Sequence, residues 1–300
     1  MKRLLLTGAS GFVGSHCIEP LLARDYEIHA VSTRAVATQD GIVWHQADLL
    51  QFSQVESLLR QITPTHLLHL AWFVAHGEYW TSPMNFRWVE ASLKLLEAFA
   101  ANGGMRAVFV GTGAEYGDHT GSCVEGKTPL HPTTLYGTCK ASLGIMLPTL
   151  SPQFGISSAW ARLFYLYGPH EKPSRLVPSA IRTLLNNQLY TCSFGDLVRD
   201  YLYIQDAADA LAALLESNVT GELNVASGEG VALNHILSCI GKQLGREQLL
   251  HFETKSASAA QLPIQIADVT HLTSEVGWTR CIPLEQGVEQ TIAWWKTHGV

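Results

Sequence analysis

The sequence lacks any apolar run long enough to cross a membrane. Its 300 residues contain no stretch that approaches the ~18 consecutive apolar residues needed to span a bilayer. The apolar residues after Met1 give way to Thr7 and Gly8 within a few positions, which is too short for a signal peptide. We therefore interpret this start as a first β-strand and expect no membrane partner.

Cysteine is also sparse, and the six cysteines do not form motifs. They are Cys17, Cys123, Cys139, Cys192, Cys239 and Cys281. None forms a C-x-x-C pair, which argues against a zinc knuckle, and their scatter in a chain of this length argues against a disulfide framework. The pattern predicts reduced thiols and a cytoplasmic protein.

Charged residues make up only 15% of the chain, and the formal net charge is −6 with a pI of about 6.1. An acidic protein does not attract nucleic acid or an anionic membrane surface, so we expect neither as a partner. The 47% of hydrophobic residues excludes a disordered chain and is typical of a globular core.

Short apolar runs alternate with longer amphipathic ones through the first half. The expected strands are Arg3–Leu6, Glu27–Ser32, His66–Leu70, Ala107–Val110 and Ser158–Arg162. The expected helices are Val13–Asp25, one containing Val55–Gln61, Trp88–Ala101 and Tyr136–Leu147. This alternation predicts an α/β fold with a Rossmann-type doubly wound parallel sheet, whose ligand crevice lies at the carboxyl ends of the strands.

The alternation of strands and helices becomes less regular towards the C-terminus, which predicts a second structural unit there. We expect a dinucleotide-binding domain over residues 1–165 and a smaller C-terminal substrate-binding lobe over 166–300. Parts of residues 200–230 are expected to return to the first domain. Loops around Tyr167–Arg175 and Ala257–Ile264 are expected in the smaller lobe.

A glycine-rich turn stands between the expected first strand and first helix. Gly8, Gly11 and Gly14 stand where a tight turn and a close backbone approach to a pyrophosphate require glycine. Phe12 and Val13 open the helix, whose free N–H groups and positive dipole end suit phosphate. The motif predicts a dinucleotide cofactor held by these five residues.

Tyr136 and Lys140 stand four residues apart on an expected helix, with Cβ atoms roughly 5–6 Å apart on one face. A free tyrosine, with a pKa near ~10, is a poor acid or base at neutral pH. A neighbouring ammonium lowers that pKa and makes the phenol useful for proton transfer. A Tyr and a Lys four residues apart are common on helices. With the glycine-rich turn earlier in the same sequence, however, this pair predicts a catalytic acid–base group.

The G-x-x-G-x-x-G spacing together with Tyr136-Gly137-Thr138-Cys139-Lys140 resembles the extended short-chain dehydrogenase/reductase family. Within it, the chain is similar to NAD(P)-dependent nucleotide-sugar epimerases, dehydratases and reductases. The resemblance runs over nearly the whole chain. Later motifs that carry it are Tyr167-Gly168-Pro169, Arg199-Asp200-Tyr201 with Asp206, and Val276-Gly277-Trp278. It implies a nucleotide-sugar substrate and a homodimer formed through the helix Trp88–Ala101.

The resemblance also implies roles for further residues. Thr112 takes the place of the family's Ser or Thr at a strand end, where the hydroxyl bonds the reacting sugar oxygen. Lys140 is implied to hold the nicotinamide ribose as well. Further cofactor contacts are implied for Asp48 and Leu49 near the adenine, and for Leu70, Ala71 and Leu163.

The stretch after the second expected strand bears on the choice of cofactor. Many NAD-using members carry an acid here for the adenosine ribose, whereas this chain has Val31-Ser32-Thr33-Arg34. A hydroxyl at Ser32 followed by the guanidinium of Arg34 suits a 2′-phosphate. NADP is therefore preferred over NAD.

Substrate contacts are implied less clearly. Arg199 matches the family arginine that contacts the nucleotide diphosphate, and Arg175 is a second candidate before an apolar helix, Leu176 to Leu185. Tyr165 stands where many relatives have an asparagine that binds the substrate phosphate. Trp88 replaces another frequent asparagine. These departures leave the pose of the substrate open.

The residues after Thr112 exclude two kinds of relative. Sugar 4,6-dehydratases carry an acid pair where this chain has Gly113 and Ala114, and Glu115 stands one position too late, facing the other way on a strand. Enzymes that epimerise at C3 and C5 have a cysteine at the position of Ala114. Elimination and that epimerisation are therefore not expected.

Three functions remain open. The preferred one is NADPH-dependent reduction of a 4-keto-6-deoxy sugar nucleotide at C4, and the alternative is an NAD-dependent sugar-nucleotide 4-epimerase. A catalytically silent NADP-binding sensor or scaffold is the alternative of another class. No metal site is expected, since His66 and His69 point to opposite faces of one strand and no acidic or cysteine cluster joins them.

Overall fold

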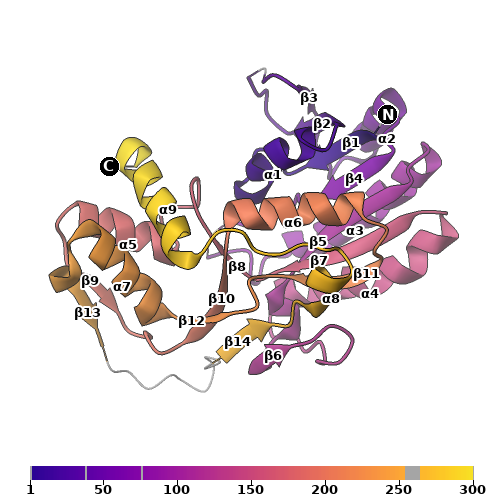
Figure 1. Ribbon diagram of the computed structural model, residues 1–300. Coiled ribbons are helices and arrows are strands. Elements are labelled where there is room, and N and C mark those ends of the chain that lie inside the picture. The colour runs from indigo at the N-terminus through magenta and orange to yellow at the C-terminus, as the bar shows by residue number, and fades with distance from the viewer. Residues whose placement is uncertain (1, 38, 76, 254–263, 300) are drawn as a thin grey trace.

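The computed structural model describes residues 2–37, 39–75, 77–253 and 264–299. A large lobe is built on one sheet, and a smaller lobe with β9, β13, α5 and α7 lies beside it (Figure 1). Of the expected loop at Ala257–Ile264, residues 257–263 lie outside the described residues. In the described ranges, no helix combines the length and apolarity that a membrane crossing requires.

The large sheet has seven parallel strands in the order β3-β2-β1-β4-β5-β7-β11. Its strands are β1 (Lys2–Thr7), β2 (Tyr26–Ser32), β3 (Ile42–Gln46), β4 (His66–His69), β5 (Arg106–Thr112), β7 (Ser157–Leu163) and β11 (Gly221–Val225). This is the doubly wound order of a Rossmann-type fold, so the predicted fold class is confirmed. The strand order reverses at β1 and β4, and the crevice of such a fold lies there.

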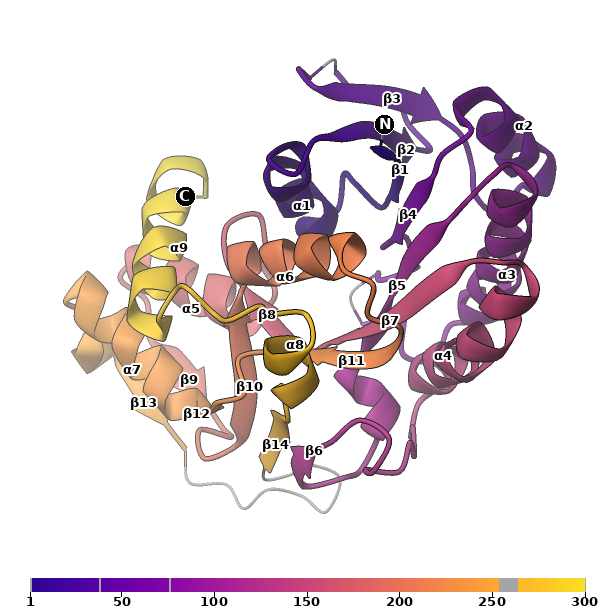
Figure 2. The same ribbon diagram turned by 45° about the vertical axis from the view of Figure 1, so that its right-hand side comes forward.

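Helices cover both faces of this sheet (Figure 2). One face carries α1 (Phe12–Leu22) and α6 (Ile204–Glu216), and the other carries α2 (Phe52–Ile62), α3 (Met84–Ala101) and α4 (Leu135–Gln153). The run Leu4-Leu5-Leu6 shows why the sequence folds this way: Leu4 and Leu6 pack with α1 and α6, whereas Leu5 packs on the opposite face. A strand covered on both sides is apolar at every position.

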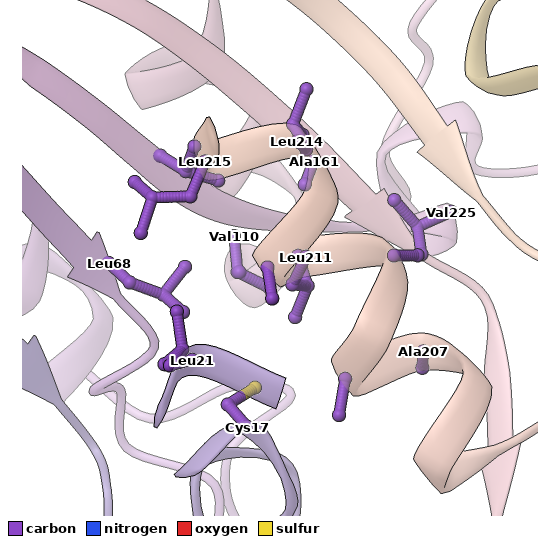
Figure 3. Close-up of a cluster of buried hydrophobic side chains, with 14 of the residues drawn as sticks. Cys17, Leu21, Leu68, Val110, Ala161, Ala207, Leu211, Leu214, Leu215 and Val225 are labelled. Carbon is purple, nitrogen blue, oxygen red and sulfur yellow. The ribbon is translucent and has the colours of Figure 1, made fainter. Parts of the chain in front are cut away.

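Helix α6 closes the core over the centre of the sheet (Figure 3). Its residues Ala207 and Leu211 are fully buried, and α6 packs against α1, whose Cys17 is also buried. The sheet side is supplied by Leu68 and Val110, which are also buried. The segment 204–225 therefore contributes α6 and the edge strand β11 to the large lobe, although it follows part of the smaller lobe in sequence.

The smaller lobe contains a sheet ordered β12-β10-β14-β6, with β8 also paired to β10, and a separate pair β13-β9. Its strands are β6 (Gly121–Cys123), β8 (Tyr165–Tyr167), β9 (Tyr190–Cys192), β10 (Val198–Tyr203), β12 (Gly230–Ala232), β13 (Leu250–Phe252) and β14 (Ile264–Ala267). Its helices are α5 (Leu176–Leu185), α7 (Leu233–Leu244) and α9 (Leu284–His298), with a 3₁₀ turn at Glu247–Leu249, whereas α8 (Thr270–Ser274) packs against β11 of the large sheet. Buried Asp200 of β10 accepts bonds from the N–H groups of Ser227, Gly228 and Ala267, which ties three segments together.

All the helices and strands expected from the sequence are present, with some shifts at their ends. The first helix ends at Leu22 and not at Asp25, because Asp25 adopts a left-handed conformation with φ of 61° and turns the chain into β2. Strand β3 was not foreseen. All six cysteines are free, in agreement with the expected reduced thiols.

Candidate active site

The glycine turn between β1 and α1 is as narrow as predicted. Gly8 has φ of +72°, and a Cβ atom added to it would lie 2.9 Å from the amide nitrogen of Ala71. A Cβ atom on Gly14 would lie 2.2 Å from the carbonyl oxygen of Gly8. Gly11 precedes the helix, and its amide donates to that same Gly8 oxygen at 3.0 Å. The helix therefore begins at Phe12 directly against the strand, and it presents its first N–H groups at the crevice.

A series of buried hydrogen bonds joins the end of β1 to the end of β4 beside it. The hydroxyl oxygen of Thr7 accepts the amide protons of Leu70 and Ala71 at 3.1 and 3.2 Å. The same hydroxyl lies 2.8 Å from Nδ1 of His69, whose Nε2 lies 2.9 Å from the hydroxyl of Ser92. Burial lowers the pKa of His69 to about 3, so the ring is neutral. The sequence did not predict these hydrogen bonds, since a lone histidine in an apolar strand does not indicate its partners.

The expected adenosine end lies at the ends of β2 and β3. Ser32 ends β2, and its hydroxyl accepts the amide proton of Arg34 at 3.1 Å, while the Arg34 side chain is exposed. Asp48 is half-buried and accepts the amide proton of Leu50 at 3.0 Å, and Leu49 is buried. The guanidinium of Arg34 is thus presented at the surface, where an anionic group can reach it.

Thr112 and Tyr136 come together across two elements. Thr112 ends β5, Tyr136 lies in the first turn of α4, and their side chains are hydrogen-bonded. Leu163 ends β7 directly beside Thr112 in the sheet. Burial raises the pKa of Tyr136 above its ordinary value, and the positive charge of Arg175 acts in the opposite direction.

Lys140 faces a different set of groups from the one expected. Its Nζ donates to the carbonyl oxygen of Val110 at 2.8 Å and lies 3.8 Å from the ring centroid of Trp72. Only 4% of Lys140 is exposed, and burial lowers its pKa to about 7. The predicted lowering of the Tyr136 pKa by the Lys140 ammonium is therefore wrong for this structure. Burial of the phenol dominates, and the lysine is held by Val110 and Trp72.

Glu115 faces the interior of the protein. The cause is not the alternation of side chains along a strand, which the sequence predicted. Residues Gly113–Tyr116 form a 3₁₀ turn, not a continued strand, and Thr112 and Glu115 cap it reciprocally. The Glu115 carboxylate accepts from Arg162 at 2.5 Å and from the indole N–H of Trp160 at 3.0 Å. Glu115 is fully buried, so it serves the core and does not face the crevice.

The expected substrate residues lie on three separate elements. Tyr165 of β8 is 38% exposed, and the guanidinium of Arg199 in β10 lies 5.7 Å from its ring centroid. Arg175 precedes α5, is exposed, and is hydrogen-bonded to the hydroxyl of Tyr79. The ring of Tyr79 packs edge-on against Tyr136 at 5.0 Å between centroids. Arg175 and Tyr136 thus meet through Tyr79, whereas Tyr165 and Arg199 form their own pair.

Two of the residues in this region had not been singled out from the sequence. Tyr79 is 5% exposed and lies in the loop after β4, far from Tyr136 along the chain. Gln265 of β14 is buried and joins the hydroxyl of Tyr165 to the carbonyl oxygen of Gly113, at 3.4 Å to each. No sequence motif predicts a role for either Tyr79 or Gln265. Among the residues that the structure describes, no three His, Cys, Asp or Glu side chains form a group that could hold a metal ion.

The family model described as "NAD dependent epimerase/dehydratase family" matches residues 4–226, which include the glycine turn, Thr112, Tyr136 and Lys140. The chain belongs to this family. Membership agrees with the resemblance to nucleotide-sugar enzymes of the extended short-chain dehydrogenase/reductase family, which is thereby confirmed. The chain is thus an enzyme of the epimerase/dehydratase type.

Individual family members extend the match over both lobes. A UDP-glucose 4-epimerase of Corynebacterium glutamicum is 26% identical over 92% of this chain and 90% of its own length. A UDP-glucuronic acid decarboxylase of Xenopus tropicalis is 25% identical over 98% of this chain and 72% of its length. The crystal structure of a Thermus thermophilus UDP-glucose 4-epimerase in complex with NAD is 27% identical, with a TM-score of 0.86 over 99% of this chain and 100% of that one.

Proposed function

We propose that the chain is a nucleotide-sugar 4-epimerase, which oxidises the C4 alcohol of the sugar and returns the hydride to the opposite face of the ketone. The observation that carries this proposal is the hydrogen-bonded pair of Thr112 and Tyr136 beside the glycine turn, with Gly113 and Ala114 in place of an acid pair. Chemistry that needs one hydride and one proton is what such a pair supports. The 4-epimerase names among the relatives favour this alternative over the ketoreductase that was preferred from the sequence.

The glycine turn fits a dinucleotide. A side chain at Gly8 would clash with the backbone of Ala71, and one at Gly14 with the backbone of Gly8, so only glycine keeps this turn tight. The helix opening at Phe12 and Val13 then offers its N–H groups to a pyrophosphate. We assign the remaining cofactor contacts to Leu70 and other residues along the same sheet edge. These are Gly11, Ser32, Arg34, Asp48, Leu49, Ala71, Tyr136, Lys140 and Leu163. A nicotinamide ring bound there supplies the hydride acceptor and donor.

Tyr136 exchanges a proton with the C4 oxygen in this proposal. The hydroxyl of Thr112 shares the hydrogen bond and stabilises charge that develops on that oxygen. Arg199 binds the nucleotide diphosphate through its forked N–H groups, and Arg175 with Tyr165 lines the sugar side. In this structure Arg199 donates to the carbonyl oxygen of Val198 at 2.8 Å, so substrate binding requires it to turn.

A second candidate is reduction of a 4-keto-6-deoxy sugar nucleotide by NADPH. Two observations favour it. The end of β2 offers Ser32, Thr33 and the exposed Arg34 with no carboxylate, which suits a 2′-phosphate. The raised pKa of Tyr136 keeps the phenol protonated at neutral pH, which is the form that delivers a proton to a ketone oxygen. NADP thus stays the preferred cofactor of this candidate, and NAD that of the epimerase.

We retain three further expectations as proposals. A homodimer through α3, which contains the expected helix Trp88–Ala101, is supported by Phe86 of α3 and by Ile145 of the neighbouring α4, which are 59% and 63% exposed. The division of labour near residue 165, with dinucleotide binding before it and substrate binding after it, follows the position of the glycine turn and of Tyr165, Arg175 and Arg199. A cytoplasmic location also stays a prediction.

One experiment separates the candidate functions. The purified protein is incubated with UDP-glucose and NAD, and in parallel with a 4-keto-6-deoxy sugar nucleotide and NADPH. Formation of UDP-galactose without net change in NADH absorbance supports the epimerase, and steady loss of NADPH absorbance supports the reductase. Dinucleotide binding without turnover across a panel of sugar nucleotides contradicts both and leaves the sensor or scaffold.

A further inference from the structure

Trp72 lies across Lys140 at the start of the loop after β4. The Nζ atom of Lys140 is 3.8 Å from the centre of the Trp72 ring and donates to the carbonyl oxygen of Val110 at 2.8 Å. Both side chains are buried, at 4% and 9% exposure. An aromatic face attracts a cation most strongly where water is excluded, so this ring favours the charged form of the lysine.

One buried amide holds the Trp72 ring in place. The indole N–H of Trp72 donates to Oδ1 of Asn85 at 2.8 Å, and Nδ2 of Asn85 donates to the carbonyl oxygens of Tyr79 and Ser82 at 2.7 and 2.9 Å. Asn85 is fully buried at the start of α3. The amide of Tyr136 donates to the carbonyl oxygen of Trp80 at 3.1 Å. Trp72 and the segment 77–82 are therefore tied to α3 and α4, and they contact Lys140 and Tyr136.

Three further groups lie near Lys140, each on a different element of the fold. His69 of β4 is neutral because burial lowers its pKa to about 3. Glu115 of the 3₁₀ turn is paired with Arg162 at 2.5 Å, and its negative charge still raises the pKa of Lys140. Trp160 of β7 lies farther away, with its ring centre 5.9 Å from Nζ. The Trp72 ring, the Val110 carbonyl and the charge of Glu115 are therefore the groups that oppose the desolvation of the ammonium.

We propose that Trp72 is a positioning residue, which favours the charged form of Lys140 and directs it along the end of β5, and that Asn85 fixes the ring for this purpose. The inference rests on the proposed function, because that function gives Lys140 its role in holding the nicotinamide ribose. A lysine that is already oriented loses less conformational freedom when the dinucleotide binds. Trp72 thus acts on cofactor binding through Lys140 without touching the reacting atoms.

The test follows the titration of Lys140 in the free protein. ¹³C-labelled lysine is observed by NMR from pH 5 to 10, and the Lys140 signal is identified by its loss in Lys140→Arg. We expect Trp72→Leu to move the Lys140 midpoint about 0.5–1 pH unit lower, because the ammonium loses the ring. Dinucleotide binding measured by calorimetry at pH 7 should weaken by roughly 3–10-fold.

Two matched variants serve as controls. Trp72→Phe keeps a ring but loses the bond to Asn85, so its shift should have the same direction and less than half the size. Trp88→Phe alters a neighbouring tryptophan, 6.1 Å from Trp72 between ring centres, and should leave the Lys140 midpoint unchanged. Thermal unfolding is recorded for each variant. If Trp72→Leu does not fold, the comparison of Trp72→Phe with Trp88→Phe decides.

The outcomes separate this inference from the proposed function. An unchanged or higher midpoint in Trp72→Leu overturns the inference, as does an equal shift in Trp88→Phe, even if the wild type interconverts sugar nucleotides. A lower midpoint confined to the Trp72 variants supports it. If the Lys140 midpoint is lower in the Trp72 variants and the wild type turns over none of the substrates, the proposed function is wrong. The inference that Trp72 stabilises charged Lys140 is then still supported.

Discussion

The part of the site proposed to bind the dinucleotide and the part proposed to bind the substrate are formed by different kinds of groups. At the dinucleotide end, backbone and buried groups set the shape: Gly8 and Gly14 leave no room for a side chain, and the Thr7–His69 bond joins β1 to β4. At the substrate end, exposed side chains such as Tyr165 and Arg175 come from separate strands and loops. The residues proposed to bind the dinucleotide are thus fixed by backbone and buried contacts, whereas those proposed to bind the substrate are exposed side chains.

This difference has a consequence for substitutions. A side chain that clashes with the backbone of the rigid end should weaken binding of the dinucleotide severely. A change in the exposed end should alter affinity by degrees. Tyr136 lies where the two ends meet, held by Thr112 on one side and by Tyr79 on the other.

The largest effect is expected from Tyr136→Phe. Removing the phenol takes away the proton exchanged with the C4 oxygen, so kcat should fall by roughly 10²–10⁴-fold with the dinucleotide affinity unchanged within about 3-fold. Steady-state kinetics and calorimetry measure the two quantities. As a control, Tyr79→Phe keeps the ring against Tyr136 and loses only the bond to Arg175, so it should cost no more than about 10-fold. Wild-type turnover in Tyr136→Phe would remove the proposed mechanism.

Gly14→Val tests the rigid end. The new Cβ would lie 2.2 Å from the Gly8 oxygen and push α1 off the turn, so dinucleotide affinity should fall by at least about 100-fold. Calorimetry measures it, and circular dichroism checks the fold. Gly11→Ala is the matched control: its Cβ would lie 3.2 Å from the same oxygen, and the loss should stay below about 10-fold. Similar losses in both variants would contradict the steric account.

Arg34→Ala tests whether the exposed adenosine end selects the cofactor. If the guanidinium binds a 2′-phosphate, NADPH affinity should fall by about 10-fold while NADH affinity stays the same. Fluorescence titrations with both dinucleotides measure the ratio. Arg60→Ala, an exposed arginine of α2, is the control for the loss of one positive charge. An unchanged ratio would rule out the NADP preference.

The smallest effect concerns stability and pH. The pKa of Lys140 is about 7 in the fold, against an ordinary value of 10.5 that applies to the unfolded chain, so the unfolded chain binds more protons between these values. The free energy of unfolding contributed by this residue therefore rises from pH 7 to 10 and is lost as the pH falls. Lys140→Met should raise the melting temperature by about 2–5 °C at pH 6 and by less at pH 9. An equal change at both pH values would show that Lys140 does not titrate in this range.

The same contrast explains what the sequence could predict. Leu4-Leu5-Leu6, the glycine spacing and the position of Thr112 are local signals, because a doubly covered strand and a tight turn each demand particular residues at adjacent positions. The orientation of Lys140 is not local. It depends on Trp72 and Val110, which the fold brings to the lysine from elsewhere in the chain.

Two misjudged segments have equally physical causes. Strand β3 is an edge strand whose Val43 is 47% exposed, so it lacks the continuous apolar run of the central strands. The segment after Thr112 has the composition of a strand end, but the reciprocal capping of Thr112 and Glu115 makes a 3₁₀ turn. The partners Trp160 and Arg162 that hold Glu115 inside the core lie on a strand much later in the sequence.

The return of residues 204–225 to the large sheet bears on how the enzyme can be re-engineered. A gene cut at residue 165 would encode a sheet whose β7 edge is unpaired and whose Leu68 and Val110 lack the cover of α6. Such a fragment is expected to aggregate. Exchanging substrate selectivity with a relative therefore means transplanting two separate cassettes, one on each side of this segment, with the segment itself kept from the parent.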